Sequence, residues 1–244
     1  MVAAVMLACG GGGGEVRTGG ASTSGQGAAS PAGSAVGGKE RASQPARTES
    51  AGDATRTGRR RVVVMGTSLT AGLGLDPADA YTTLLQHKAD SAGLDVEIVN
   101  AGYSGETSAG ALRRVDWLLR KPVDVFVLET GANDGLRALN VDSTRANIEA
   151  ILARVKAARP AARVLIAQME APPNLGSRYT SEFRAMFPSI AERSGATLIP
   201  FILEGVAGHA DLNQSDGIHP NETGERIVAA NIWKSLRPVL EARE

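Results

Sequence analysis

Three side chains of the sequence, a serine, a histidine and an aspartate, stand in settings that suit nucleophilic catalysis. Ser68 lies in a short Gly/Thr-rich segment at residues 66–70, and Asp216 and His219 lie together in the segment DGIHP at residues 216–220. A serine hydroxyl is a poor nucleophile at neutral pH and needs a neighbouring base, which in turn needs a carboxylate to fix its tautomer. Gly and Pro in residues 216–220 predict a turn, so the carboxylate of Asp216 is within reach of the imidazole.

The choice of base follows from the small number of histidines. The chain has three. His87 falls in a predicted helix, and His209 falls in a Gly/Ala-rich loop without an acidic residue at the same spacing. Taken singly, a loop serine or an Asp-Gly turn is most often only structural. Their joint placement favours a Ser68, His219 and Asp216 triad.

Acyl transfer also needs hydrogen-bond donors where the oxyanion develops. Three candidates are the backbone N–H of Ser68, the N–H of Gly105 and the side-chain amide of Asn133. Residues 133–135 (NDG) are also typical of a turn, and Gly105 is also explained as a loop glycine that permits an unusual backbone angle. These structural roles are compatible with the catalytic ones.

The segments that would position these groups alternate between β-branched runs and amphipathic helical stretches. The apolar runs predict strands at 62–65, 96–100, 125–129, 164–168 and 197–201, with Glu97 and Pro200 as their polar and proline exceptions. Short, mostly apolar strands separated by helices indicate a parallel sheet with helices on both faces. We therefore expect one three-layer α/β/α domain over residues 61–244, with a five-stranded parallel sheet.

Local signals also predict the helices. Asp76-Pro77 is expected to start the first helix and Asp142 to cap a later one. Three helical faces are predicted from apolar spacing: Leu112, Val115 and Leu119; Ile148, Ile151, Leu152 and Val155; and Val228, Ile232 and Leu236, in a final helix that ends before Pro238.

The carboxyl ends of parallel strands are where ligands bind in such sheets. Five loops leave that edge, at residues 66–70, 101–107, 130–135, 171–174 and the long segment ending at 216–220. All of the candidate catalytic residues fall in these loops. The fold class and the candidate chemistry therefore agree.

Composition excludes several other functions. Twenty-six basic and 26 acidic residues give a formal net charge of +0, which argues against a nucleic-acid partner. A single cysteine excludes an intrachain disulfide and argues against a cysteine-based zinc site. No apolar run approaches the roughly 20 residues that cross a bilayer.

The first 60 residues differ in character from the rest. Residues 1–9 (MVAAVMLAC) resemble the end of a bacterial lipoprotein signal, in which Cys9 would carry the lipid; an ordinary apolar N-terminus is the alternative. No basic residue precedes Cys9, which a translation start further upstream would explain. Residues 10–60 are rich in Gly, Ala, Ser and Thr and predict a flexible tether. With seven basic and four acidic residues the tether carries +3, so the remainder carries −3.

The ordered motifs resemble those of the SGNH (GDSL-type) hydrolases, and in particular the bacterial periplasmic arylesterase, acyl-CoA thioesterase and lysophospholipase branch. The resemblance covers nearly all of residues 61–244. It rests on four blocks: GTSLTAG at 66–72, SGETS at 104–108, GANDGLR at 131–137 and DGIHP at 216–220. It implies a flavodoxin-like fold, Ser68 as nucleophile, Asp216 and His219 as its partners, and Gly105 and Asn133 as oxyanion donors.

One position departs from the family pattern, and one segment extends the resemblance. Thr67 stands where the family's Gly-Asp-Ser-Leu motif has its aspartate, which puts the local hydrogen bonding around Ser68 in question. The segment after the fourth strand also resembles the family, and there we expect Pro172, Asn174 and Tyr179 to contact the substrate.

The resulting expectation is an exported, periplasmic or cell-envelope serine esterase. It would be a monomer that needs no metal or organic cofactor, would act on a small-molecule ester or acyl substrate, and would meet the membrane only through Cys9. Two alternatives are a carbohydrate O-deacetylase of the same fold, which the aromatic content of 4% makes less favoured, and a flavodoxin-like phosphate- or flavin-binding module. The binding module would leave Asn133 and the Asp216–His219 pair without a role.

Overall fold

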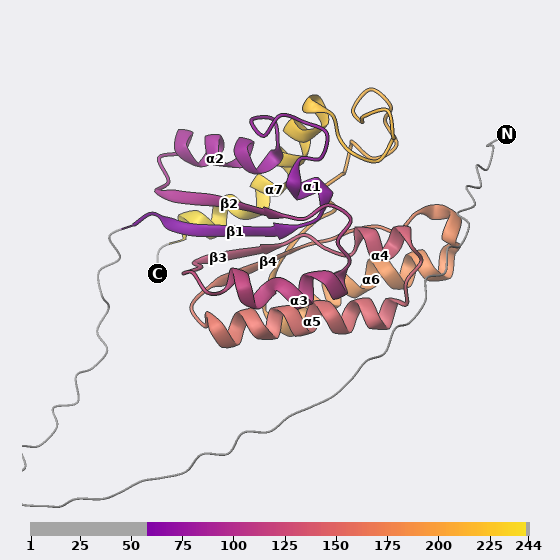
Figure 1. The fold of residues 1–244 in the computed structure, drawn as a ribbon, viewed down its shortest axis with the longest axis horizontal. Coiled ribbons are helices and arrows are strands. Elements are labelled where there is room, and N and C mark those ends of the chain that lie inside the picture. The colour runs from indigo at the N-terminus through magenta and orange to yellow at the C-terminus, as the bar shows by residue number, and fades with distance from the viewer. Residues whose placement is uncertain (1–57, 243–244) are drawn as a thin grey trace, which may run out of the picture. The chain divides into compact units, whose positions relative to one another are not determined.

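A computed structural model describes residues 58–242 and contains a five-stranded parallel sheet (Figure 1). The strand order is β2-β1-β3-β4-β5, with every neighbouring pair parallel. This confirms the predicted three-layer, flavodoxin-like architecture. The strands are β1 (Arg60–Gly66), β2 (Val96–Gly102), β3 (Val125–Leu128), β4 (Arg163–Ala167) and β5 (Thr197–Ile199).

Helices cover both faces of the sheet (Figure 1). Helix α2 packs against α7 on one face, and α3, α5 and α6 pack side by side on the other. The helices are α1 (Ser68–Ala71), α2 (Tyr81–Ser91), α3 (Ser108–Leu118), α4 (Ala132–Leu136), α5 (Val141–Ala158), α6 (Ser177–Ser194) and α7 (Glu222–Glu241), with a 3₁₀ turn η1 at Pro173–Leu175. None of the helices within residues 58–242 has the length and apolar character needed to cross a membrane.

The core lies on the central strands. Every residue of β3 and the stretch Val62 to Met65 of β1 is buried, because these strands have helices on both faces. Val64 of β1 pairs with Asn100 of β2 on one side and with Val127 of β3 on the other. The apolar runs of the sequence therefore mark the centre of the domain.

Two predicted helix starts were wrong. Helix α2 begins at Tyr81 rather than at Pro77, because the Asp76 carboxylate accepts the N–H of Ala78 in a separate turn. Helix α5 is capped by Asn140, whose side chain accepts the N–H of Ser143, and Asp142 lies in its first turn. Several polar residues near each helix start are suitable N-caps, and the local sequence did not show which of them the helix uses.

Two predicted ends also differ from the structure. Strand β5 ends at Ile199, before Pro200, which has no N–H to donate. Helix α7 continues through Pro238 to Glu241, although the sequence predicted its end before the proline. Its last carbonyls are satisfied from the sheet, since Arg163 donates to the oxygen of Val239 and Arg60 to that of Leu240, at 2.7 Å each.

The predicted N-terminal features lie outside the described residues. This applies to residues 1–9, to Cys9 and to residues 10–57 of the predicted tether. Of that tether, Gly58, Arg59 and Arg60 are described, and Arg60 is the first residue of β1.

Candidate active site

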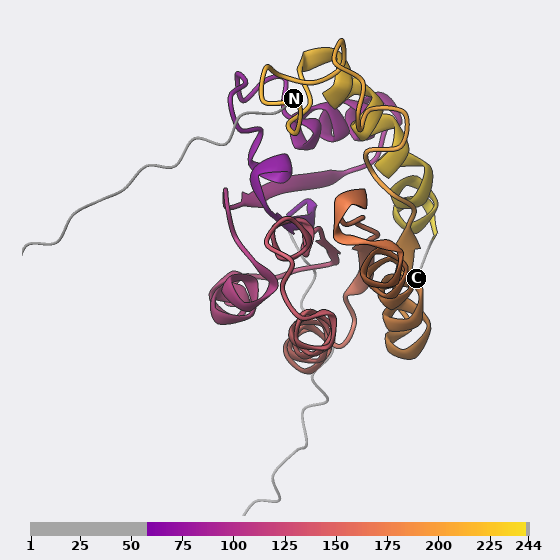
Figure 2. The same ribbon diagram turned by 90° about the vertical axis from the view of Figure 1, so that its right-hand side faces the viewer.

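The nucleophile candidate lies at the carboxyl end of β1, between the loops that follow β2 and β3. Figure 2 looks onto this edge of the sheet. Ser68 is the first residue of α1, directly after the N-cap residue Thr67, and only 8% of its surface is exposed. Strand β1 is also where the strand order reverses, which is the usual position of ligand sites in doubly wound sheets.

A hydrogen-bonded chain joins Ser68 to the other two triad candidates. The Oγ of Ser68 lies 2.8 Å from Nε2 of His219, and Nδ1 of His219 lies 2.6 Å from Oδ2 of Asp216. Sequence reasoning therefore selected three residues that the fold brings together, although 151 positions separate Ser68 from His219. This is the geometry that activates a serine through a base oriented by a carboxylate.

Backbone contacts hold the Asp216 carboxylate in place. Its Oδ1 accepts the N–H of Ile218 at 2.9 Å and of His219 at 3.0 Å, so residues 216–219 form the predicted turn. These bonds, with the one from the imidazole, lower the pKa of Asp216 to about 2. The aspartate therefore stays ionised over the whole range in which an esterase works.

The three oxyanion donor candidates come from the start of α1, the loop after β2 and helix α4. The amide of Asn133, in α4, donates to the carbonyl of Glu106 at 3.0 Å, which fixes it beside Gly105. Gly105 has φ of 76°, a left-handed angle that favours glycine. Among residues 58–242 the backbone N–H groups of Ser68 and Gly105 have no hydrogen-bond partner, so both are available to an anion.

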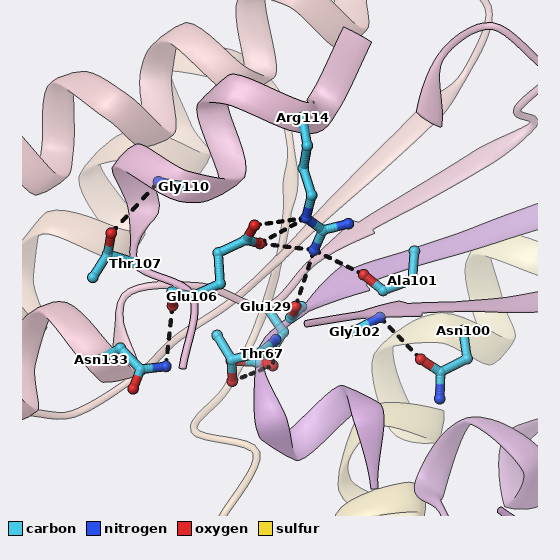
Figure 3. A network of polar contacts seen from close by, with 11 residues as sticks. Thr67, Asn100, Ala101, Gly102, Glu106, Thr107, Gly110, Arg114, Glu129 and Asn133 are labelled. Atoms are coloured by element: carbon cyan, nitrogen blue, oxygen red, sulfur yellow. Dashed lines mark hydrogen bonds and ion pairs between the residues drawn. The ribbon is translucent and has the colours of Figure 1, made fainter. Parts of the chain in front are cut away.

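An arginine that sequence reasoning missed connects the loops of the site (Figure 3). The guanidinium of Arg114, on α3, binds the Glu106 carboxylate at 2.7 Å. Its Nη2 also donates to the carbonyl oxygens of Gly66 and Ala101, at the ends of β1 and β2. One planar cation thus fixes the end of β1, which leads into Ser68, relative to the loop that carries Gly105.

Sequence reasoning also missed Glu129, whose side chain lies next to the turn at residues 66–70, here called the nucleophile turn (Figure 3). Its buried carboxylate accepts the N–H of Thr67 at 2.7 Å, the hydroxyl of Thr67 at 3.0 Å and the hydroxyl of Thr70 at 2.9 Å. Burial raises the pKa of Glu129. An added Cβ at Gly66 would lie 1.8 Å from Oγ1 of Thr70, so this packing requires a glycine there.

The buried polar network continues to the last helix. The hydroxyl of Thr70 lies 2.5 Å from that of Tyr81, and the N–H of Tyr81 donates to Glu225 of α7 at 2.6 Å. Burial raises the pKa of Tyr81 well above its ordinary value and that of Glu225 to about 8. One feature of the sequence could have indicated this network: Glu129 is an acidic residue at the end of an otherwise apolar run.

The predicted substrate contacts occupy the segment between β4 and α6. Pro172 precedes η1, and Asn174 is exposed within it. The hydroxyl of Tyr179 donates to the carbonyl of Leu139 at 2.6 Å, which ties this segment to the loop after α4. The substrate roles of Pro172, Asn174 and Tyr179 stay predictions. Within residues 58–242 no group of three or more His, Cys, Asp or Glu side chains could hold a metal ion.

Comparison with known proteins identifies the family. Residues 64–227 match the GDSL-like lipase/acylhydrolase family. The chain is 38% identical over 181 residues to esterase TesA of Pseudomonas aeruginosa, which covers 73% of this chain and 89% of that protein. It is 36% identical over 180 residues to thioesterase 1/protease 1/lysophospholipase L1 of Escherichia coli, covering 73% and 84%.

A solved structure agrees with these relatives. The psychrotrophic esterase EstA from Pseudoalteromonas, inhibited by monoethylphosphonate, superimposes with a TM-score of 0.71 at 35% identity, covering 75% of this chain and all of that one. The fold, the family match and the relatives lead to one conclusion: the chain belongs to the GDSL-like lipase/acylhydrolase family and is an ester hydrolase.

Proposed function

We propose that this protein hydrolyses carboxylic esters through Ser68, His219 and Asp216 and an acyl-enzyme intermediate. The observation that supports the proposal is the continuous hydrogen-bonded chain from Ser68 Oγ through His219 to Asp216. Because Asp216 is ionised and bonded to Nδ1, it favours the tautomer in which Nε2 of His219 is free to accept the serine proton.

In the first half of the reaction Ser68 Oγ attacks the ester carbonyl carbon while Nε2 of His219 takes its proton. The oxygen of the tetrahedral intermediate receives hydrogen bonds from the N–H groups of Ser68 and Gly105 and from the Asn133 amide. Collapse of the intermediate breaks the ester bond, and His219 returns the proton to the leaving alcohol or thiol. Water then attacks the acyl-serine by the same route and releases the acid.

We propose aryl esters, acyl thioesters or lysophospholipids as substrates. The named activities of relatives, arylesterase, thioesterase and lysophospholipase, support this set. We also propose that Cys9 carries a lipid and anchors the exported protein to the cell envelope. Mass spectrometry of the mature N-terminus in the native host tests the anchor, and an unmodified Met1 would refute it.

A serine substitution tests the mechanism. Ser68→Ala should abolish hydrolysis of p-nitrophenyl acetate and covalent labelling by a fluorophosphonate. Ser104→Ala, at an exposed serine of the loop after β2, is the control and should retain both. Wild-type turnover or labelling by Ser68→Ala would contradict the proposal.

A further inference from the structure

Exposed apolar side chains concentrate around the triad. Among residues 58–242 six large hydrophobic side chains are exposed, and five of them lie where the chain leaves the carboxyl ends of the strands, four in loops and Leu136 at the end of α4. We call these five the apolar rim: Leu73 (45% exposed), Tyr103 (64%), Leu136 (49%), Leu139 (38%) and Ile218 (47%). The sixth, Trp117, lies on α3 and is as exposed as Tyr103, at 64%. Exposed apolar groups gathered around one site indicate an interaction surface.

Backbone contacts tie the rim to the catalytic groups. The N–H of Leu73 donates to the carbonyl of Ser68 itself, at 3.1 Å. The N–H of Ile218 donates to the Asp216 carboxylate at 2.9 Å. The N–H of Tyr103 donates to the carbonyl of Gly66 at 2.9 Å, two residues before the nucleophile. These three members of the rim therefore lie beside the triad.

The end of α4 and the loop after it present two members of the rim, Leu136 and Leu139, in a fixed conformation. Residues 136–140 are all exposed, and Ala138 is the one non-glycine residue within 58–242 with a left-handed backbone (φ 51°). Such a conformation is unfavourable for a residue with a Cβ and persists where its surroundings impose it. The side chain of Arg137 and the carbonyl of Leu139 are bound, to Gly105 and Tyr179 respectively.

Few charges interrupt this surface. Residues 66–75 and 101–105 carry none, and residues 135–140 carry only Arg137. In residues 213–220 the one acidic group is Asp216, which is bonded to His219. Because the rim is apolar and nearly uncharged, it fits an uncharged or zwitterionic apolar interface better than a charged macromolecule.

Access to Ser68 decides what kind of partner can cover the rim. An occupant on these loops also covers the entrance to a nucleophile that is only 8% exposed. A stably bound protein would block turnover, whereas a lipid aggregate would supply the ester from its own surface. We propose that the apolar rim docks reversibly on a zwitterionic lipid surface from which the site draws its substrate. This inference rests on the proposed esterase function.

Vesicle binding tests the docking directly. The full chain carries Cys9→Ser, so that no lipid anchor contributes, and Ser68→Ala, so that no hydrolysis occurs. Sedimentation with phosphatidylcholine vesicles should show binding that the pair Tyr103→Ser and Leu139→Ser weakens about tenfold or more. Trp117→Ser, which removes an equally exposed side chain outside the rim, should bind like the parent. Equal loss in both variants, or no binding by the parent, would overturn the proposal.

Turnover separates surface docking from an acyl-chain groove. With Ser68 restored, the Tyr103→Ser and Leu139→Ser pair should lower turnover of a long-chain ester about tenfold above its critical micelle concentration. Turnover below that concentration, and of p-nitrophenyl acetate, should stay within twofold. An equal loss on monomeric and micellar ester would show that the rim binds single acyl chains and would overturn surface docking. Absence of all hydrolysis by the parent would refute the esterase proposal alone, because vesicle binding is measured independently.

Discussion

The carboxylate of Glu129 accepts both the backbone N–H and the hydroxyl of Thr67, the residue directly before the proposed nucleophile. Thr67 is also where the sequence departs from the family's aspartate. A threonine hydroxyl donates and cannot ionise, so it pairs with a buried carboxylate without adding charge. The departure therefore leaves both the N–H and the hydroxyl of Thr67 hydrogen-bonded.

Glu129→Gln should impair catalysis as well as stability. The substitution turns part of an acceptor into an NH₂ donor that faces the donors of Thr67 and Thr70. We expect the free energy of unfolding to fall by about 1–3 kcal/mol, the cost of an unpaired buried polar group. We also expect kcat to fall about tenfold or more with little change in KM, because the turn that aims Ser68 loosens.

Urea unfolding and kinetics with p-nitrophenyl acetate measure both effects. Glu97→Gln is the control, since this acid lies on β2 with its side chain 54% exposed and should change stability by less than about 0.5 kcal/mol. A stability loss in Glu129→Gln with unchanged kcat would mean that Glu129 supports only the fold.

Arg114→Lys should lower kcat although it keeps the charge. A lysine ammonium cannot reproduce the planar contacts to Glu106 and to the carbonyls of Gly66 and Ala101. Arg113→Lys, at the exposed neighbouring position on α3, should behave like the wild type. The measurement is kcat and KM for both variants, and indistinguishable values would remove Arg114 from the positioning of the site.

The strands and the triad could be predicted because their signals are local. A run of β-branched residues such as 62–65 predicts a buried strand from its composition alone. Asp216 and His219 are close enough in the chain to lie in one turn. Once the sheet is parallel, the loop carrying Ser68 must lie on the same edge as that turn. The fold and the grouping of the triad therefore followed from patterns a few residues long.

The supporting network could not be predicted in the same way. Thr67, Tyr81, Glu129 and Glu225 come from four segments far apart in the chain. Thr67 meets Glu129 because β1 and β3 are neighbours, and the contacts of Tyr81 depend on how α2 and α7 pack. The continuation of α7 through Pro238 could not be predicted either, because the arginine side chains that bind the carbonyls at the end of α7 come from β1 and β4. Tertiary partners decided these features.

Asp216→Asn should reduce kcat by several orders of magnitude while leaving the fold intact. The asparagine oxygen can still accept the N–H groups of Ile218 and His219, so the turn is kept. Its amide would donate to Nδ1 and impose the wrong imidazole tautomer, a change that costs about 10⁴ in a serine protease. Asp211→Asn, an exposed acid of the same long segment, is the control. Kinetics and circular dichroism check this, and kcat within tenfold of wild type would contradict the proposed role.

Asn133→Ala should cost about 10²–10³ in kcat if its amide serves the oxyanion. The substitution also removes the hydrogen bond to the carbonyl of Glu106. Asn147→Ala, which removes an amide bonded to Ser108 instead, is the matched control. Steady-state kinetics of both variants on one aryl ester make the comparison, and similar losses would indicate a structural role for Asn133.

Glu225 should make the protein less stable as the pH rises. Burial raises its pKa from 4.5 to about 8 in the folded state, so between these values the folded chain binds more protons than the unfolded chain. The free energy of unfolding therefore falls with rising pH in that window, by at most about 1.4 kcal/mol per pH unit for this one group. Urea unfolding at several pH values between about 5 and 8 measures the slope.

Glu225→Gln keeps the acceptor for the N–H of Tyr81 but cannot ionise, so its unfolding free energy should depend less steeply on pH. Glu222→Gln, at an exposed acid in the first turn of the same helix, should keep the wild-type slope. The two variants carry the same change in formal charge, so a difference between them reports burial. Equal slopes in all three proteins would show that Glu225 is already ionised in the folded state.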